Sequence, residues 1–318
     1  MEVKNNYQLS IINCQLLNKS YGNIKAIDNL SFEVEQGEIY GIIGPDGAGK
    51  TTLFRILTTL ILADSGTAFV NGLDVVKDYK QIRNIIGYMP GKFSLYQDMT
   101  VEENLTFFAT VFGTTIQENY YLIEDIYKQI EPFKTRRAGK LSGGMKQKLA
   151  LSCALIHKPV VLFLDEPTTG VDPVSRKEFW QMLKRLKTQG ITIVVSTPYM
   201  DEAKLCDRIA LMLNGKFMQI DTPQNIVAQF TETLWAAEGN NMRKLLKDLQ
   251  TNPLVKTAYS FGDTIHVTFN GELEMENSEW TIKNGDNHSQ LSIKNCQLKK
   301  VQPSVEDCFM FLAKNNEK

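Results

Sequence analysis

Short apolar runs and segments with helical spacing alternate along the first two thirds of the chain. The first run, Ile39–Ile43, is bounded by glycines and is typical of a buried strand. After a glycine-rich break, apolar residues recur at helical spacing from Thr51 to Leu60. Val160–Leu164 and Ile191–Val195 predict two more buried strands, and Ser175–Lys187 predicts a helix between them. Strands that alternate with helices predict an α/β fold with a mostly parallel core sheet covered on both faces.

A helical segment interrupts this alternation. Residues 93–140 contain no apolar run that predicts a central strand. Thr100-Val-Glu-Glu103 has the spacing of a capping box, which opens a helix, and Leu105 to Phe112 continue it at helical spacing. We therefore expect a helical subdomain, at about residues 93–155, inserted into the α/β core.

The character of the chain changes near residue 228. Beyond it, Thr264–Phe269 and Leu291–Ile293 predict short strands, Met242–Leu249 and Pro303–Leu312 predict helices, and residues 277–289 are polar and turn-rich. We therefore expect one α/β domain over residues 1–228 and a small α+β accessory domain over residues 229–318.

Length, composition and charge narrow the classes of function. The chain has 318 residues, a net charge of −1 and a sequence pI near 6.4, so it shows no electrostatic footprint of a nucleic-acid-binding protein. Its five cysteines are scattered, as expected of reduced thiols in a cytosolic protein. No apolar run approaches the ~20 residues of a membrane helix, and the N-terminus does not resemble a secretory signal. We expect a cytoplasmic protein that reaches a membrane only through a partner.

The glycine-rich break after the first strand carries the strongest chemical signal. Gly44-Pro-Asp-Gly-Ala-Gly49-Lys50-Thr51 fits the pattern of a phosphate-binding loop between a strand and a helix. Glycines let the backbone N–H groups face the phosphates, and the positive end of the following helix points at the same anion. Lys50 is expected to reach the β- and γ-phosphates, and Thr51 to bind Mg²⁺. The expected phosphate-binding residues are Gly44, Pro45, Asp46, Gly47, Ala48, Gly49, Lys50, Thr51 and Thr52.

Two acidic residues follow the second predicted strand. Asp165 and Glu166 come directly after Val160–Leu164, and ligands of open α/β sheets bind at the carboxyl ends of the strands. Asp165 is therefore expected to hold Mg²⁺, directly or through water. Glu166 is the candidate catalytic residue, which would orient and polarise the attacking water.

A third motif names a family. Leu141-Ser-Gly-Gly-Met145-Lys-Gln-Lys148 predicts a helix with Ser142 at its N-cap, and such a helix start is another anion site. With the two motifs above, this segment resembles the signature of ATP-binding-cassette (ABC) ATPases. The resemblance covers residues 9–228 and implies a P-loop NTPase fold that binds and hydrolyses ATP with Mg²⁺.

The resemblance also implies partners and further site residues. In ABC proteins two chains sandwich two ATP molecules head to tail, so Ser142, Gly143 and Gly144 would meet the γ-phosphate held by the opposite subunit. Tyr21 resembles the aromatic residue that stacks on adenine, although a strand-end tyrosine without that role is the alternative. Asp172, in Gly170-Val-Asp172-Pro173, resembles the residue that contacts the partner ATPase.

The closest likeness within the family is to the ATPases of ABC-2 type multidrug exporters. Asp46 in the phosphate loop and a C-terminal extension with Pro303-Ser-Val-Glu-Asp307 suggest it. The likeness implies an ABC-2 type membrane permease as partner and a peripheral position on the inner face of the cell membrane.

The sequence departs from the family pattern at two positions. Gly91 stands where the family has a glutamine that contacts Mg²⁺ or water, and Gln97 has the wrong spacing to replace it. Pro198 stands where the family has a histidine that bonds the γ-phosphate, and proline has no N–H to substitute. We therefore expect this chain to be the degenerate half of an asymmetric ATPase pair, although the retained Glu166 leaves a slow homodimer open.

Two other functions stay open. A soluble ABC ATPase that acts on proteins or nucleic acid is one, although the chain lacks long coiled-coil heptads. A binding-only regulatory subunit is the other, and Gly91 and Pro198 favour it. The transported substrate cannot be read from this sequence.

Overall fold

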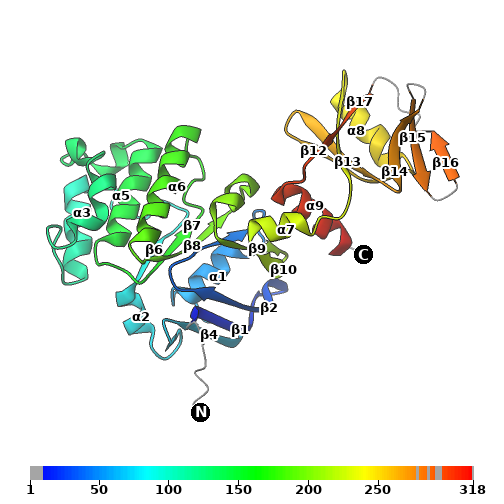
Figure 1. Cartoon of the computed structure of the whole chain (residues 1–318). Coiled ribbons are helices and arrows are strands. Elements are labelled where there is room, and N and C mark those ends of the chain that lie inside the picture. Colours follow the sequence, from blue (N-terminus) through cyan, green and yellow to red (C-terminus); the bar gives the residue numbers. More distant parts are fainter. Residues whose placement is uncertain (1–9, 277–278, 285–286, 291–295, 317–318) are drawn as a thin grey trace, which may run out of the picture. The chain divides into compact units, whose positions relative to one another are not determined.

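The chain forms two compact units. The computed structural model describes residues 10–276, 279–284, 287–290 and 296–316 (Figure 1). The units are Met1–Pro223 and Gln224–Lys318. The division falls within helix α7 (Pro223–Ala228), whereas the predicted boundary lies after residue 228, and the predicted strand Leu291–Ile293 lies outside the described residues.

A six-stranded sheet forms the centre of the described part of the first unit. Its order is β10-β9-β3-β8-β7-β6, and every neighbouring pair is parallel except β9 and β10. The mostly parallel core sheet is thus confirmed. Its strands are β3 (Ile39–Ile43), β6 (Ile86–Met89), β7 (Val161–Asp165), β8 (Thr192–Thr197), β9 (Arg208–Leu213) and β10 (Lys216–Asp221).

Both faces of this sheet are covered. All residues of β3, β7 and β8 are buried, which explains why these strands read as unbroken apolar runs. Helix α1 (Lys50–Leu57) contacts β7 and also an antiparallel sheet of order β2-β1-β4-β5, while helix α6 (Pro173–Thr188) packs on β3 and β8. The antiparallel sheet consists of β1 (Ser10–Tyr21), β2 (Ile24–Glu35), β4 (Ser65–Val70) and β5 (Leu73–Asp74), and helix α2 (Tyr79–Ile85) follows it.

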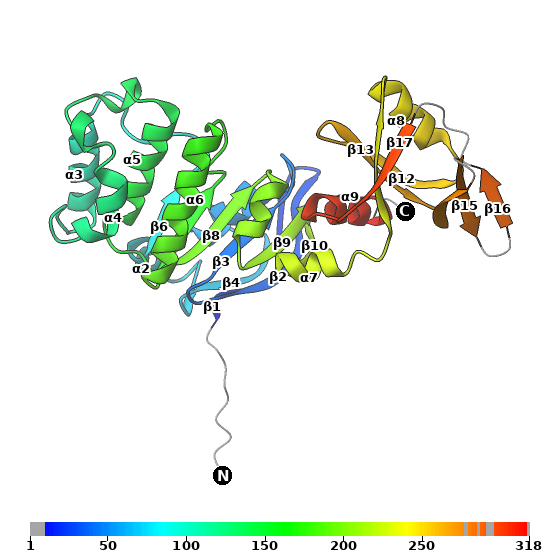
Figure 2. The same cartoon turned by 45° about the horizontal axis from the view of Figure 1, so that its top comes forward.

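The predicted helical segment is present. Helices α3 (Val101–Val111), α4 (Tyr120–Tyr127) and α5 (Gly143–Leu155) pack beside one another, and α5 also contacts the edge strand β6 (Figure 2). The capping box is confirmed, because Thr100 Oγ1 accepts from Glu103 N at 3.1 Å and Glu103 Oε2 accepts from Thr100 N at 2.7 Å. Short 3-10 helices occupy Glu131–Phe133, Ala138–Lys140 and, after β8, Met200–Leu205.

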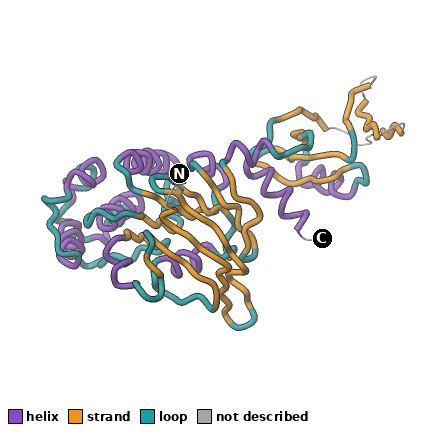
Figure 3. The backbone as a smooth tube through the Cα atoms, turned by 60° about the horizontal axis from the view of Figure 1, so that its bottom comes forward, coloured by secondary structure: helices purple, strands orange, loops and turns teal. Residues whose placement is uncertain are grey.

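The second unit is built on an antiparallel sheet of order β12-β13-β11-β17 (Figure 3). Leu245 and Leu249 of helix α8 join Ala237, Ile265 and Val267 of the sheet in one core. The elements of this sheet and its helices are β11 (Leu234–Gly239), α8 (Met242–Thr251), β12 (Val255–Phe261), β13 (Thr264–Phe269), β17 (Cys296–Val301) and α9 (Val305–Asn316).

A second, three-stranded sheet corrects one expectation. Its order is β14-β15-β16, with β14 (Glu272–Glu276), β15 (Glu279–Asn284) and β16 (Asn287–Gln290). The sequence predicts a polar, turn-rich stretch at residues 277–289, yet β15 and most of β16 lie there. These strands are short and polar, so they contain no apolar run that predicts a strand. Their antiparallel backbone pairing identifies them in the structure.

One buried carboxylate joins α9 to the sheet of the second unit. Asp307 is fully buried, and its Oδ1 accepts from Tyr259 at 2.6 Å and contacts His266 Nδ1 at 2.5 Å. Its Oδ2 accepts from the backbone N of Ser304 at 2.7 Å and from the Ser304 hydroxyl at 2.6 Å. Asp307 therefore caps the helix and anchors it to β12 and β13.

No helix in the described part of the chain is both long and apolar enough to cross a membrane.

Candidate nucleotide site

The glycine-rich segment forms a tight loop between β3 and α1. Gly49 has φ 109°, and a Cβ there would lie 2.3 Å from the carbonyl oxygen of Ala26. A Cβ on Gly44 would lie 2.2 Å from the carbonyl oxygen of Met212. Only glycine fits at these two positions, because β2 and β9 approach the loop backbone so closely. The loop is therefore braced from two sides.

The lysine of this loop lies at its centre. Lys50 is 3% exposed, and its ammonium donates to the carbonyl oxygens of Gly44 at 2.8 Å and Pro45 at 3.0 Å. The same ammonium lies 3.1 Å from Glu166 Oε1. The phosphate loop and the carboxylate that follows β7 thus meet at one charged group, although Lys50 and Glu166 lie far apart in the sequence.

The two acidic residues after β7 have different surroundings. Asp165 is 2% exposed, and its Oδ1 accepts from Ser196 Oγ at 2.6 Å. Glu166 has φ 49°, and its backbone N donates to the carbonyl oxygen of Ser196 at 3.0 Å. Its side chain is 24% exposed. A non-glycine residue in the left-handed region is uncommon, and here it turns the chain at the end of the strand so that Glu166 faces a pocket.

That pocket collects residues from four parts of the first unit. Its volume is about 530 Å³, and its lining includes Tyr21, the phosphate loop and Glu166. Four lining residues were missed by sequence reasoning: Ile24, Lys25, Ala26 and Asn214. The signal for Asn214 was the Asn214-Gly215 dipeptide, a hairpin turn between β9 and β10. The complete lining is Tyr21, Ile24, Lys25, Ala26, Asp46, Gly47, Gly49, Lys50, Thr51, Thr52, Glu166 and Asn214.

The residues expected to face the opposite subunit lie elsewhere. Ser142 caps α5 by accepting from Met145 N at 3.4 Å, and it does not line this pocket. A Cβ on Gly144 would lie 3.1 Å from Ser175 Oγ, so the start of α5 lies beside the start of α6. Asp172 caps α6, accepting from Val174 N at 3.1 Å and Ser175 N at 3.0 Å. The hydrogen bond that Ser175 N–H donates to Asp172 is the main reason that the pKa of Asp172 is lowered.

Comparison with known proteins decides the family. The sequence profile described as ABC transporter matches residues 27–169. The chain is 37% identical over 219 residues to the daunorubicin resistance ATP-binding protein DrrA2 of Streptomyces coeruleorubidus, covering 68% of either chain. The chain belongs to the ABC transporter family of ATP-binding proteins.

Other ABC relatives share this similarity. The probable multidrug ABC transporter ATP-binding protein YbhF of Escherichia coli K12 is 42% identical over 225 residues, which are 69% of this chain and 38% of YbhF. This chain therefore spans well under half of YbhF. A solved dimeric structure of the ATP-binding cassette MJ0796, bound to ADP and Pi, superposes with a TM-score of 0.61 at 25% identity, covering 66% of this chain and 98% of that one. The P-loop NTPase fold of an ABC cassette is thus confirmed.

The two departures from the ABC pattern lie near the acidic residues. A Cβ on Gly91 would lie 3.1 Å from the carbonyl oxygen of Asp165 and 3.8 Å from Glu166 Cβ. Gln97 accepts from Gly139 N at 2.9 Å through its carbonyl oxygen, in the helical segment. Pro198 directly follows β8, whose last residue, Thr197, accepts from Gly44 N at 3.2 Å. Position 91 therefore adjoins the acidic pair, and Pro198 adjoins a residue bonded to the phosphate loop.

A buried ionic cluster beside Pro198 was not predicted. Glu202 is 1% exposed, and its two carboxylate oxygens accept from Thr168 Oγ1 at 2.8 Å and Thr197 Oγ1 at 2.6 Å. The Nε of Arg176 lies 3.6 Å from Glu202 Oε1, and the guanidinium lies 4.1 Å from the centre of the Tyr199 ring. Glu202 therefore holds together the loop after Glu166, the end of β8 and the first turn of α6.

Proposed function

We propose that this chain binds ATP in the pocket described above and hydrolyses it. The observation that carries this proposal is the meeting of the phosphate loop and Glu166 at the Lys50 ammonium, 3.1 Å from Glu166 Oε1. Tyr21 lines the same pocket and supplies an aromatic face for adenine. A purified chain is expected to bind ATP, and Lys50→Ala to abolish binding. Equal binding by both proteins would refute the assignment.

Each residue of the site has a distinct chemical task in this proposal. Lys50 and backbone N–H groups between Asp46 and Thr52 bind the β- and γ-phosphates, where the positive end of α1 adds its field. Thr51 and Asp165 offer a hydroxyl and a carboxylate, the oxygen ligands that Mg²⁺ prefers, and Mg²⁺ bound there would offset the phosphate charge. Glu166 exchanges its contact with Lys50 for the attacking water, which it orients and polarises.

The energy of hydrolysis is proposed to drive a membrane exporter. YbhF and DrrA2 carry multidrug transport and drug resistance in their names, which supports a drug exporter. The likeness of Asp46 and the Pro303–Asp307 extension to ABC-2 type ATPases supports an ABC-2 type permease as the partner. In this proposal the chain is cytoplasmic and peripheral on the inner face of the cell membrane. Residues 1–228 act as the nucleotide-binding domain, and residues 229–318 as an accessory domain.

The active assembly is proposed to be a head-to-tail pair of ATPases. Ser142, Gly143, Gly144 and Asp172 do not line this chain's own pocket, which fits a role toward the opposite subunit. The MJ0796 cassette is dimeric, which supports pairing. Gly91 and Pro198 weaken this chain's own site, so its partner would be a different ATPase that retains the glutamine and the histidine.

Two variants separate the asymmetric pair from a homodimer. In the mixed complex, Ser142→Arg is expected to abolish hydrolysis, because it blocks the anion site presented to the partner's nucleotide. Glu166→Gln is expected to change the rate little, because it disables a site that is already slow. Rapid multiple turnover by this chain alone, or strong loss of activity from Glu166→Gln, would contradict the asymmetric pair.

A further inference from the structure

The turn between β1 and β2 lines the side of the pocket where we propose that the nucleotide base binds. Tyr21 and Ile24 pair across this turn, and their side chains are 48% and 72% exposed. Both line the pocket. An aromatic and a branched apolar side chain at the mouth of a phosphate-binding pocket present the kind of surface on which a heteroaromatic base stacks. We call Tyr21 and Ile24 the base platform.

The phosphate side of the pocket is braced by the turn between β9 and β10. Gly215 N donates to the carbonyl oxygen of Ala48, within the phosphate loop, at 2.9 Å. Asp28 N donates to the carbonyl oxygen of Gly215 at 2.9 Å. A Cβ on Gly215 would lie 3.0 Å from the carbonyl oxygen of Ala26, so β2 packs closely on this turn. One glycine thus links the phosphate loop to the strand that begins at the base platform.

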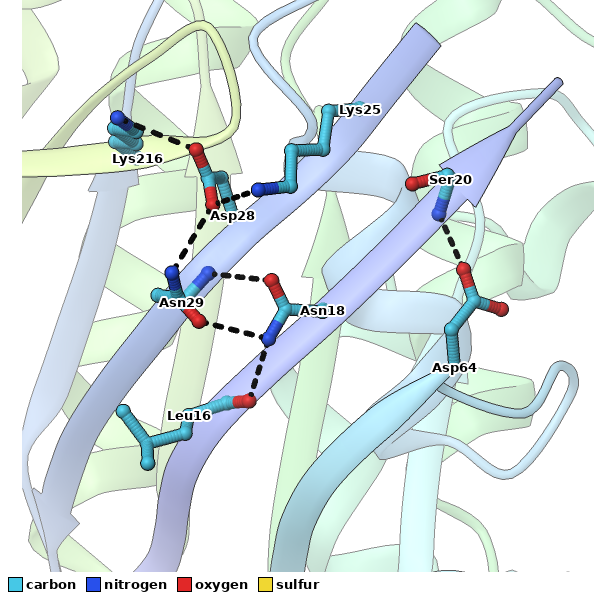
Figure 4. A network of polar contacts seen from close by, with 8 residues as sticks. All are labelled: Leu16, Asn18, Ser20, Lys25, Asp28, Asn29, Asp64 and Lys216. Atoms are coloured by element: carbon cyan, nitrogen blue, oxygen red, sulfur yellow. Dashed lines mark hydrogen bonds and ion pairs between the residues drawn. The ribbon is translucent and has the colours of Figure 1, made fainter. Parts of the chain in front are cut away.

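The carboxylate of Asp28 reinforces this link from both directions (Figure 4). Its Oδ1 accepts from Lys25 Nζ at 2.6 Å, and its Oδ2 lies 3.2 Å from Lys216 Nζ. Lys25 lines the pocket next to Ile24, whereas Lys216 opens β10 directly after the turn. The Asp28 side chain is 14% exposed, whereas those of Lys25 and Lys216 are 55% and 65% exposed, so water screens these pairs from the lysine side.

The neighbouring strand is anchored in the same region. Asn18 Nδ2 donates to Asn29 Oδ1 at 2.9 Å, and Asn29 Nδ2 donates to Asp28 Oδ1 at 3.3 Å (Figure 4). Asp64 Oδ2 accepts from the backbone N of Ser20 at 2.6 Å, one residue before Tyr21. The end of β1 and the start of β2 are therefore held by side chains, and Asp28 alone among them also pairs with β10.

We propose that Asp28 is a positioning residue that sets the base platform relative to the phosphate loop and so controls the base-dependent part of nucleotide affinity. The proposal rests on the proposed ATP binding and names a residue that the motifs do not include. Loss of the Asp28 charge frees Lys25 and loosens β2 from β10. The base platform then moves while the phosphate loop, held through backbone bonds, stays in place.

The test compares two ligands on the full chain. Calorimetry with Mg²⁺ measures binding of ATP and of inorganic triphosphate, which lacks base and ribose. Asp28→Asn is expected to weaken ATP binding about fivefold, the effect of losing a partly shielded ion pair, and to leave triphosphate binding within twofold. The matched control is Glu33→Gln, which removes the charge from the acceptor of the 2.6 Å hydrogen bond that Asn13 donates to Glu33, on the same two strands and outside the pocket. It is expected to change neither affinity.

A second pair of variants distinguishes the proposed role of Asp28 from a general loss of stability. In Tyr21→Ala the base platform is already impaired, so adding Asp28→Asn is expected to cause less than a twofold further loss of ATP affinity. Equal loss of ATP and triphosphate binding, or a full fivefold loss in the Tyr21→Ala background, would overturn the role of Asp28. If the unmodified chain binds neither ligand, it is the proposed function that fails.

Discussion

The buried cluster around Glu202 makes a quantitative prediction, because helix α6 carries two arginines in contrasting ion pairs. Arg176 faces Glu202, which is 1% exposed, whereas Arg185 pairs with Asp125 at 2.6 Å with side chains 53% and 62% exposed. Glu202→Ala removes the acceptor of the Thr168 and Thr197 hydroxyls and a carboxylate 3.6 Å from the Arg176 guanidinium. Breaking such a buried pair costs about 3 kcal/mol of unfolding free energy. Asp125→Ala is expected to cost under about 0.5 kcal/mol, since exposed pairs contribute little.

Urea denaturation of the first unit measures this difference. The chain has three tryptophans, and Trp180 on α6 is 2% exposed. In a Trp235→Phe, Trp280→Phe background, Trp180 fluorescence reports on the first unit alone, which avoids mixing the unfolding of two units. With a slope of about 3 kcal/mol per M urea, Glu202→Ala is expected to lower the midpoint by about 1 M. A midpoint shift no larger than that of Asp125→Ala would refute the reasoning.

Three further predictions follow from other parts of the chain. The double change Gly91→Gln and Pro198→His is expected to raise the rate of ATP hydrolysis by this chain alone at least about tenfold, measured as phosphate release. The reason is that a well-oriented general base contributes about that factor or more. An unchanged rate would show that these two positions do not limit hydrolysis. Burial alone would raise the pKa of Asp307, but bonds from His266, Ser304 and Tyr259 outweigh it and lower that pKa. Its contribution to the stability of the second unit is therefore complete above the unfolded value of about 3.9 and is lost as pH falls through the lower folded pKa. Urea melts between pH 6 and pH 2 check this, and Asp307→Asn should remove that part of the pH dependence. Burial raises the pKa of the Cys14, Cys153 and Cys206 thiols, and that of half-buried Cys296 to about 11. Iodoacetamide at pH 8 is therefore expected to label the native chain slowly, with Cys296 first, and rapid labelling of Cys14 would contradict the packing around β1.

The sequence predicted the features whose signals are local. The strand Ile39–Ile43, the phosphate loop and α1 lie within one short segment, so periodicity and glycine spacing were sufficient. The capping box at Thr100 and the N-cap at Ser142 are likewise local and were confirmed. The antiparallel sheet of β1, β2, β4 and β5 was missed, because its strands carry bulges and register shifts that break the alternation of buried and exposed residues.

Features that depend on distant pairings could not be predicted. Glu202 meets Thr168 and Arg176 only because β7 and β8 are neighbours in the sheet. Asp28 meets Lys216 only because β2 approaches β10. Neither contact leaves a periodic or compositional trace in the chain. The proposed contribution of Ser142 to a partner's site involves a second chain, so one chain alone does not display it.

The central claim, that this chain serves a membrane exporter as one of two unlike ATPases, is tested most directly by its partners. The chain would be tagged, purified gently from the membranes of the cells that make it, and its companions identified by mass spectrometry. We predict recovery of an ABC-2 type permease and a second ABC ATPase that has the glutamine and the histidine at the positions of Gly91 and Pro198. Recovery of the permease with this chain as its only ATPase would contradict the asymmetric pair. Recovery of no membrane protein, under conditions in which the complex is shown to survive extraction, would contradict the exporter itself.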